Sequence, residues 1–440
     1  MRTDAIHAPV VGRWCRSHDF AVQWRIGLGS NTPIKHDIAI ADQRGITLRS
    51  DQADATDAFC GGGGRGLVVM PTGTGKTVVA MDIMLRLQKS TLVVVPVRDL
   101  MYQWHEKIRQ ATGIDAGLIG DGVHRVSPVS VTTYDSAAIH MPRIGDRFEL
   151  LIFDEVHHLA GPWRSDAARM SIATHRLGLT ATLPDHPERL RTLNDLVGPT
   201  VYQQSIAEAS GRSLANYQIH RIAVSMSAVE RERYEALSKR IQTFVFEQKE
   251  LDPHFAWEDT YRLSAAGRDD PVRAQAANAA MRAFRQKRQI EEHATGKQRA
   301  LEDLFRLHHG EPIIVFTGSN VMARKISTRF MVPCLLSHCG KRERREWLQG
   351  FADGQFPVLV ANRVLDEGVD LPEVKTAIVL GGLSSSRQAI QRLGRVLRKG
   401  SGNQPAVLYE VVLNETKEVQ RSRDRRRNDA YQMNRGGTDR

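Results

Sequence analysis

Short apolar runs, rich in β-branched residues, recur along this 440-residue chain. The nine runs that are long enough for buried strands are Leu67–Met70, Thr91–Val95, Val129–Thr133, Leu150–Phe153, Leu177–Thr180, Ile313–Phe316, Pro357–Ala361, Ala377–Leu380 and Ala406–Val412. Several are separated by segments with helical spacing, such as Ala80, Ile83, Met84 and Leu87. Apolar strands that alternate with helices are typical of parallel sheets buried on both faces. Because the runs fall into two groups, the sequence predicts an α/β protein with two parallel-sheet lobes.

The segment between the two groups, roughly residues 205–305, has a different pattern. An edge strand is expected at Ile219–Val224, followed by a helical stripe made of Leu237, Ile241, Phe244 and Val245. Glycine and proline near 267–271 mark a break before a second helix, expected from Val272 to about Glu292. The predicted organisation is a short β-like extension at 1–45, a first lobe at 46–210, a second lobe at 211–414 with a helical insertion at 228–300, and a solvated basic tail at 415–440.

Composition narrows the class of protein. Lys and Arg number 61 against 50 Asp and Glu, and the formal charge of +11 favours a polyanionic partner. No apolar run approaches the ~20 residues of a membrane span, and Met1–Val10 lacks the pattern of a signal peptide. The four cysteines are too few and too scattered for a disulfide framework or a zinc site, so a reducing cytoplasm is predicted.

The strongest local signal is the glycine-rich segment Met70–Thr77, between an apolar run and a helical pattern. Such a turn lets backbone N–H groups and a helix N-terminus face phosphate oxygens. The candidate phosphate-binding residues are Gly73, Thr74, Gly75, Lys76 and Thr77. Lys76 is expected to neutralise the terminal phosphates and the Thr77 hydroxyl to hold Mg²⁺. An ordinary glycine turn is the alternative; in this context the segment predicts an ATP·Mg²⁺ site.

Asp154 and Glu155 follow the apolar run Leu150–Phe153, at the carboxyl end of a strand, where α/β proteins form ligand sites. A strand that ends in two acids also fits a helix N-cap. Downstream of a phosphate loop, nucleotide hydrolysis is the better interpretation. Asp154 is then expected to hold Mg²⁺ through water, and Glu155 to orient or deprotonate the attacking water.

With further motifs in the same order, the chain resembles the superfamily 2 helicases. Leu-Arg-Ser-Asp-Gln, ending at residue 52, resembles the adenine-reading Q element, which implies that Gln52 bonds the adenine edge and Arg49 lies against its ring. The segment around Arg98 resembles motif Ia, and Thr132-Thr133-Tyr resembles a later strand-contacting motif. The resemblance therefore implies nucleic-acid contacts from Arg98, Thr132 and Thr133.

The resemblance implies two further elements that couple the nucleotide site to the rest of the protein. Thr180-Ala-Thr182 resembles motif III, the coupling element. His157 is expected to bridge the nucleotide site to Gln391, and His158 to be structural. These adjacent histidines are expected to point apart, which argues against a shared metal ion.

The resemblance also implies nucleotide contacts from residues of the second lobe. A motif V segment includes Gly368 and Asp370, which implies a γ-phosphate approach and a contact with the ribose or an arginine finger. Gln391–Arg398 resembles motif VI. Arg395 and Arg398, three residues apart on a helix, are expected to stabilise the charge of a phosphoryl-transfer transition state.

Within the superfamily, the chain is most similar to XPB-type DNA helicases, through the segments at 154–158, 176–182 and 391–395. The likeness extends from about residue 46 to 427. It implies two RecA-like lobes and ATP hydrolysis that drives movement on single-stranded or forked DNA, with 3′→5′ strand separation. Two alternatives stay open, an RNA helicase and a motor subunit of a repair or defence complex whose partner is a nuclease.

XPB-like proteins also carry a helical thumb between motifs III and IV, where this chain has its helical insertion. Arg282, Arg285 and Arg288 recur on one flank of the second helix and are predicted to grip the phosphate backbone. The opposite, apolar flank is predicted to comprise Ala276, Ala279, Ala283 and Ile290. A solvated helical face is the alternative. For Trp104 and Trp163, packing in the core or at its rim is expected rather than stacking on bases.

Overall fold

The computed structural model describes residues 37–184, 186–214, 216–265, 270–336, 338–362, 374–380 and 405–426. The described residues divide into two compact units, and the boundary between them lies at Asn216 and Tyr217. Within the described part of the chain, no helix is long and apolar enough to cross a membrane.

The first unit is built on a sheet with the strand order β4-β3-β5-β2-β6-β7-β1-β8. The strands are β1 (Arg65–Val69), β2 (Thr91–Val95), β3 (Gly117–Gly120), β4 (Val123–His124), β5 (Val129–Thr133), β6 (Leu150–Asp154), β7 (His175–Thr180) and β8 (Thr200–Gln203). All neighbours pair in parallel except β3 and β4. Every residue of β2, β5 and β6 is buried, as predicted for apolar strands covered on both faces.

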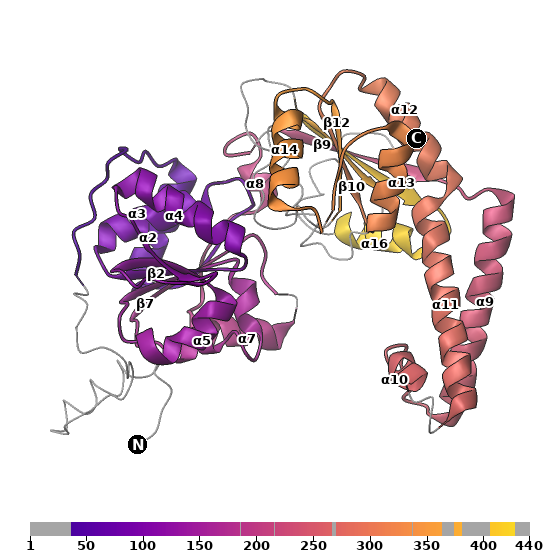
Figure 1. Cartoon of the computed structure of the whole chain (residues 1–440), viewed down its shortest axis with the longest axis horizontal. Helices are drawn as coiled ribbons and strands as arrows, with labels where there is room; N and C mark the ends of the chain where they lie inside the picture. Colours follow the sequence, from indigo (N-terminus) through magenta and orange to yellow (C-terminus); the bar gives the residue numbers. More distant parts are fainter. Residues whose placement is uncertain are drawn as a thin grey trace. The chain divides into compact units, whose positions relative to one another are not determined.

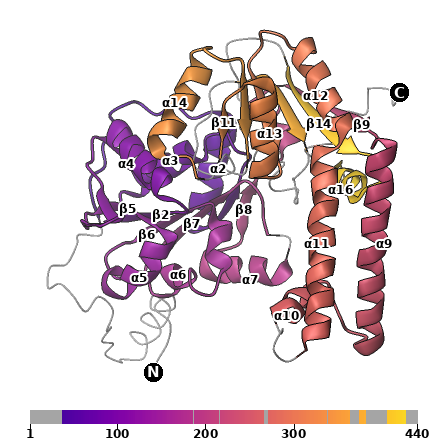
Figure 2. The same ribbon diagram turned by 45° about the vertical axis from the view of Figure 1, so that its right-hand side comes forward.

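Helices cover both faces of this sheet (Figure 1). They are α2 (Ser50–Gly61), α3 (Lys76–Leu87), α4 (Arg98–Thr112), α5 (Tyr134–Ile144), the 3-10 helix η2 (Val156–Ala160), α6 (Asp166–Arg169), α7 (Pro187–Leu196) and α8 (Ile206–Ala209). Helices α2, α3 and α4 lie on one face, and α5, α6 and α7 lie on the other (Figure 1 and Figure 2). Each face has its own apolar core, one around Trp104 and the other around Tyr134.

The second unit has a sheet with the order β11-β12-β10-β13-β14-β9, and all of its strands are parallel. The strands are β9 (Tyr217–Val224), β10 (Ile313–Thr317), β11 (Cys334–Leu335), β12 (Val358–Ala361), β13 (Thr376–Leu380) and β14 (Ala406–Leu413). Its helices outside the insertion are α12 (Thr295–Leu307), α13 (Asn320–Phe330), α14 (Lys341–Ala352) and α16 (Lys417–Arg426). The edge position of β9 confirms the expectation for residues 219–224.

The insertion is a long helical pair. Helix α9 (Ala228–Leu251) lies beside α11 (Pro271–His293), and the short α10 (Asp259–Ala265) packs at their far end from the sheet (Figure 1 and Figure 2). The buried positions of α11 are Ala274, Ala277, Ala280 and Ala283. The predicted flank was therefore wrong by part of a turn, because Ala276, Ala279 and Ile290 are only partly buried. A ridge of alanines spaced by three residues lets two helices approach closely.

The start of the C-terminal tail is also different from the prediction. Residues 417–426 form α16, which docks on the second unit instead of standing free in solvent. Lys297 Nζ of α12 lies 2.7 Å from a carboxylate oxygen of Glu418, and the Lys297 side chain is 1% exposed. The buried Ser422 hydroxyl donates to Glu410 at 2.6 Å. These polar contacts anchor α16, whereas the arginines at 421, 423 and 425–427 dominate the sequence pattern.

Candidate active site

The strand order brings three candidate segments together. Strands β6, β7 and β1 are adjacent, and their carboxyl ends carry Asp154-Glu155, Thr180 to Thr182 and the phosphate loop. In the register, Val69 pairs with Thr180, and Asp154 pairs with Leu179. Ligand sites of parallel sheets form at this edge.

The phosphate loop has the backbone that its glycines predict. Gly73 and Gly75 have φ angles of 89° and 87°, a region that disfavours side chains. Gly75 precedes α3, so Lys76 and Thr77 occupy its first turn. Lys76 is buried, and its Nζ donates to the carbonyl of Met70 at 3.1 Å, while the Thr74 hydroxyl donates to the carbonyl of Pro71 at 2.7 Å. The loop is therefore held in a defined shape by its own side chains.

Asp154 ends β6 with a fixed carboxylate. One oxygen, Oδ1, accepts the backbone N–H of Glu155 at 3.0 Å, and Oδ2 accepts Trp104 Nε1–H at 2.8 Å. Glu155 has a φ angle of 49°, uncommon for a residue with a side chain, and begins the turn into η2. This backbone conformation makes the chain reverse directly after the strand, with both acids at the end of β6.

The predicted coupling residues of the first unit lie in one hydrogen-bonded group. The Thr180 hydroxyl donates to the carbonyl of Thr182 at 2.9 Å and lies 3.4 Å from His157 Nδ1. The same His157 nitrogen is 3.6 Å from a Glu155 carboxylate oxygen. The N–H of Met70 donates to the carbonyl of Thr180 at 3.0 Å. Motif III therefore contacts the phosphate loop directly and the acidic turn through His157.

The two histidines of this turn do not point apart, contrary to expectation. The rings of His157 and His158 have centroids 4.4 Å apart, because both belong to the tight 3-10 turn η2 and do not continue the strand. His158 also contacts Arg164 at 3.1 Å. Among the described residues, no group of three or more His, Cys, Asp or Glu has the geometry of a metal site.

The Q-like residues are bonded to the phosphate loop. Gln52 is 2% exposed; its Nε2 donates to the carbonyl of Thr74 at 2.9 Å, and its Oε1 accepts the backbone N–H of Arg49. The Arg49 guanidinium donates to the same Thr74 carbonyl. Gln52 also explains Gly75, since a Cβ there would collide with the Gln52 amide. In this structure the element fastens the loop, and its contact with adenine stays a prediction.

A polar cavity of about 510 Å³ adjoins the Q-like element. Its walls include the three acids Asp51, Asp54 and Glu208, together with Arg49 and Arg212. All of these residues belong to α2, α8 and the segments next to them, so this side of α2 offers hydrogen-bond donors and acceptors to a polar ligand.

The predicted nucleic-acid residues of the first unit differ in accessibility. The Arg98 side chain is 65% exposed and lies 2.6 Å from Asp121, which also accepts the Tyr102 hydroxyl at 2.9 Å. That hydrogen bond raises the pKa of Tyr102 above its usual value. Thr132 corrects the prediction: its side chain is fully buried, and its hydroxyl donates to the carbonyl of Ile119 at 2.6 Å. Thr132 lies inside the sheet between β2 and β3, so its side chain has no access to a bound strand.

Thr133, the next residue, is 8% exposed, and its hydroxyl caps α5 by accepting the N–H of Ser136 at 3.3 Å. It therefore lies at the rim of the sheet, where α5 begins. Its proposed nucleic-acid contact stays a prediction.

The thumb arginines are exposed on α11. Arg288 lies 3.6 Å from Glu292, which accepts the hydroxyl of Ser319 at 2.6 Å. No carboxylate of the described residues lies within ion-pair distance of Arg282 or Arg285. These two guanidinium groups are therefore available to a polyanion.

Five predicted residues lie outside the part of the chain that the structure describes. They are Gly368, Asp370, Gln391, Arg395 and Arg398. Their roles stay as the sequence predicted them.

Sequence reasoning missed two residues at this site. Trp104, expected to be a packing residue, is 2% exposed but also bonds Asp154. The Tyr134 hydroxyl donates to the carbonyl of Asp154 at 2.9 Å. Trp104 and Asp154 are 50 positions apart in the sequence, and no spacing pattern signals such a contact. By contrast, Trp163 is 56% exposed at the surface.

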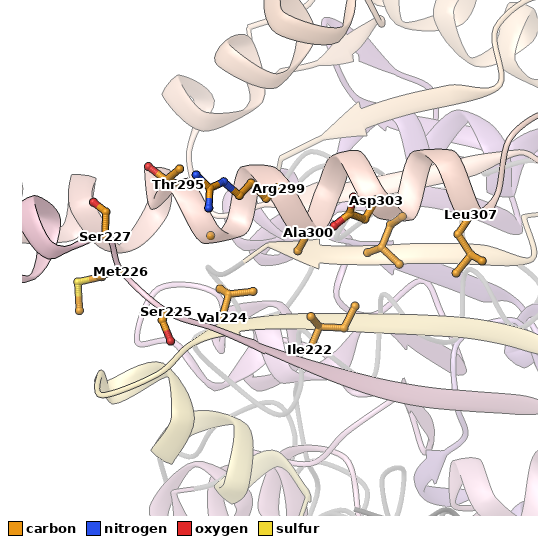
Figure 3. Close-up of a pocket in the computed structure, with 12 residues that line it drawn as sticks. Ile222, Val224, Ser225, Met226, Ser227, Thr295, Arg299, Ala300, Asp303 and Leu307 are labelled. Atoms are coloured by element: carbon orange, nitrogen blue, oxygen red, sulfur yellow. The ribbon is translucent and has the colours of Figure 1, made fainter. Parts of the chain in front are cut away.

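A second cavity, of about 610 Å³, lies in the second unit between β9 and α12 (Figure 3). Ile222 and Val224 of β9 point toward α12, where Ala300 and Leu307 lie (Figure 3). The lining contains Arg299 and Asp303 as its charged members, and none of the predicted site residues. Its walls are mainly apolar.

Comparison with known proteins gives matches in both units. The family model described as "Type III restriction enzyme, res subunit" matches residues 45–185. The one described as "Helicase conserved C-terminal domain" matches residues 296–400.

Curated relatives are similar over most of the chain. The "DNA 3'-5' translocase XPB2" of Sulfurisphaera tokodaii is 39% identical over 387 residues, which are 87% of this chain and 85% of the relative. The "DNA 3'-5' helicase XPB" of Kineococcus radiotolerans is 28% identical over 89% of this chain. The chain spans just under two thirds of that relative, 64% of its length.

Solved structures share the fold. The helicase domain of Pyrococcus furiosus Hef aligns with a TM-score of 0.58 at 20% identity and covers 87% of this chain and 100% of the domain. S. cerevisiae Dbp5, solved with RNA and ADP BeF3, aligns with a TM-score of 0.55 at 15% identity, over 87% of each chain. These alignments confirm the predicted fold, two RecA-like α/β lobes. The helical insertion in the second lobe is the pair α9 and α11.

Proposed function

We propose that this chain, which belongs to the XPB family of superfamily 2 helicases and translocases, is an ATP-driven motor that moves along DNA with 3′→5′ polarity. Family membership follows from the similarity to the Sulfurisphaera translocase, most of whose length the chain covers. It makes the chain an ATP-using enzyme of the helicase class.

The observation that carries the proposal is the meeting of three motifs at one edge of the first sheet. The phosphate loop, the acidic pair and motif III come from neighbouring strands. A backbone hydrogen bond joins the loop to motif III, and His157 contacts both Thr180 and Glu155. The Thr77 hydroxyl and the Asp154 carboxylate are hard oxygen donors, the type that Mg²⁺ prefers, so the donor set fits this ion. When bound, Mg²⁺ neutralises negative charge on the phosphates.

Each side chain then has a defined task in hydrolysis. Lys76 exchanges its bond with the Met70 carbonyl for the terminal phosphates of ATP. Glu155 orients the attacking water and takes its proton. Arg395 and Arg398 stabilise the charge that spreads over the transferred phosphoryl group. The bonded group of His157 and Thr180 responds to the state of the nucleotide through Glu155 and the phosphate loop.

Contacts with DNA come from exposed cations. Arg98 at the start of α4, and Arg282, Arg285 and Arg288 on α11, bind backbone phosphates. Opening and closing of the nucleotide site would alternate the grip of these groups and so move the chain along a strand.

The test is the rate of ATP hydrolysis with single-stranded, forked and duplex DNA and with single-stranded RNA. We expect strong stimulation by single-stranded or forked DNA, and little by RNA. Equal or greater stimulation by RNA would reassign the chain to the RNA helicases. A rate that no nucleic acid changes would overturn the proposal.

A place in a repair or defence complex, with a nuclease as partner, is the alternative setting for the same motor. Isolation of the tagged chain from its own cells tests it. A stoichiometric nuclease that is needed for DNA-stimulated ATPase would favour this setting, and full activity of the chain alone would argue against it. A cytoplasmic location remains a prediction from the sequence.

A further inference from the structure

Asp154 accepts hydrogen bonds from side chains on both faces of the first sheet. Its carboxylate accepts the indole N–H of Trp104, from α4, and its carbonyl accepts the hydroxyl of Tyr134, from α5. The two helices cover opposite faces (Figure 1). Both rings are buried, so water does not compete for either hydrogen bond.

Both helices begin at segments that we assign to nucleic-acid contact. Helix α4 starts at Arg98, whose side chain is 65% exposed, and Trp104 follows on the same helix. Helix α5 starts at Tyr134, directly after Thr133 at the rim of the sheet. A strand bound at these positions would act on the two helices whose side chains hold Asp154.

The two hydrogen bonds require donor groups that apolar packing alone does not supply. A phenyl ring would fill most of the volume of Trp104, but only the indole offers a donor to Oδ2 of Asp154. Groups that hydrogen-bond a metal ligand orient it, and their loss usually weakens metal binding by about 10–100-fold. The other oxygen, Oδ1, accepts the backbone N–H of Glu155, a contact that does not involve Trp104.

We propose that Trp104 and Tyr134 are positioning residues for Asp154, and that they make its hold on Mg²⁺·ATP depend on DNA bound at α4 and α5. This inference rests on the proposed function. It assigns to the interior of the first unit a direct route from the strand-binding helices to the metal carboxylate, in addition to motif III.

The test compares Trp104→Phe and Tyr134→Phe with Trp163→Phe, a matched control at an exposed tryptophan of the same unit. Binding of a non-hydrolysable ATP analogue is measured by calorimetry at a series of Mg²⁺ concentrations, with and without a single-stranded oligonucleotide. In the wild type, DNA should lower the Mg²⁺ concentration needed for half-maximal binding. In Trp104→Phe that concentration should rise roughly tenfold, and DNA should no longer lower it. Tyr134→Phe should change in the same direction by less, and Trp163→Phe should match the wild type.

The outcomes separate this inference from the proposed function. Wild-type dependence on Mg²⁺ and DNA in both variants, at an unchanged melting temperature, would overturn the inference alone. A wild-type ATPase that DNA does not stimulate would overturn the proposed function and the inference with it. If Trp104→Phe does not fold, Tyr134→Phe serves as the test, because it loses one oxygen and keeps the ring. An undiminished effect of DNA on Mg²⁺ dependence in Tyr134→Phe would then overturn the inference.

Discussion

The nucleotide edge of the first unit and the thumb of the second use polar side chains in opposite ways. At the ends of β1, β6 and β7, polar groups are largely buried and bonded to one another, as with Asp154 and Trp104. On α11, Arg282 and Arg285 are exposed, and the described residues place no carboxylate against them. Bond-breaking needs groups fixed in advance, whereas a sliding grip on phosphates needs charges that are free to exchange partners.

The most severe test of this contrast is in the nucleotide edge itself. Lys76→Ala and Glu155→Gln should each lower ATP hydrolysis by at least roughly 100-fold. Lys76→Ala should also weaken ATP binding, because it removes the charge that holds the phosphates. Glu155→Gln should still bind ATP, because Thr77 and Asp154, the residues proposed to hold magnesium, remain. Steady-state ATPase and nucleotide titration measure both effects.

Lys107→Ala, at an exposed lysine of α4, is the control for Lys76→Ala and should behave as the wild type. Turnover near the wild-type rate in either active-site variant would contradict the assigned roles.

The next test asks whether a buried ion pair differs from an exposed one on the same helix. Lys297 is 1% exposed and bonds Glu418, whereas Arg306 is 72% exposed and lies 3.0 Å from Glu302. Lys297→Met should lower the free energy of unfolding by about 3–5 kcal/mol, because it leaves a buried carboxylate unpaired. Arg306→Met should cost less than about 1 kcal/mol. Urea denaturation measures both, and equal losses would show that α16 is not anchored through this pair.

The thumb gives a smaller effect with a distinct signature. Changing Arg282, Arg285 and Arg288 to Gln should weaken DNA binding and reduce its salt dependence, by ~0.7–0.9 in slope for each lost phosphate contact. ATPase without DNA should not change, since α11 contributes nothing to the phosphate loop.

A second triple variant, with Arg306, Arg329 and Arg342 changed to Gln, removes the same charge from other exposed positions of the second unit. It should leave the salt slope near the wild-type value. If both triple variants lower the slope equally, the thumb has no special grip and its arginines form an ordinary solvated face.

The smallest expected effect is on stability at low pH. Burial lowers the pKa of His293, at the end of α11, and nearby Lys325 and Lys297 act in the same direction, against Glu292. The unfolded chain therefore binds this proton more readily, and stability should fall as the pH drops through about 6.5. Melting temperatures at pH 7 and pH 5 measure the loss, which His293→Gln should reduce. His309→Gln, at an exposed histidine, should retain the full loss.

The sheets could be predicted from the sequence because their strands are buried on both faces. Thr91–Val95 and Val129–Thr133 have the bounds that the apolar runs indicated. The continuous apolar composition of such strands indicates that both faces are covered. The candidate residues directly follow these apolar runs, so their position at the carboxyl ends of the strands could be predicted as well.

Contacts that depend on packing could not be predicted. The buried ridge of α11 is made of alanines, and a helix rich in alanine offers several apolar faces of similar quality. Thr132 was predicted to contact nucleic acid, but the pairing of β5 with β2 and β3 buries it. The bond between Trp104 and Asp154 depends on the packing of α4 over β2 and β5, next to β6, which neither residue signals alone.

The most direct test of the central claim is directional movement on DNA. The chain is mixed with ATP and single-stranded oligonucleotides that carry streptavidin on a biotin at the 5′ or the 3′ end, and streptavidin release is followed over time. A 3′→5′ motor should displace streptavidin from the 5′ end, and this displacement should require ATP and disappear with Glu155→Gln. Release that is equal at both ends, or that persists in Glu155→Gln, would contradict the account.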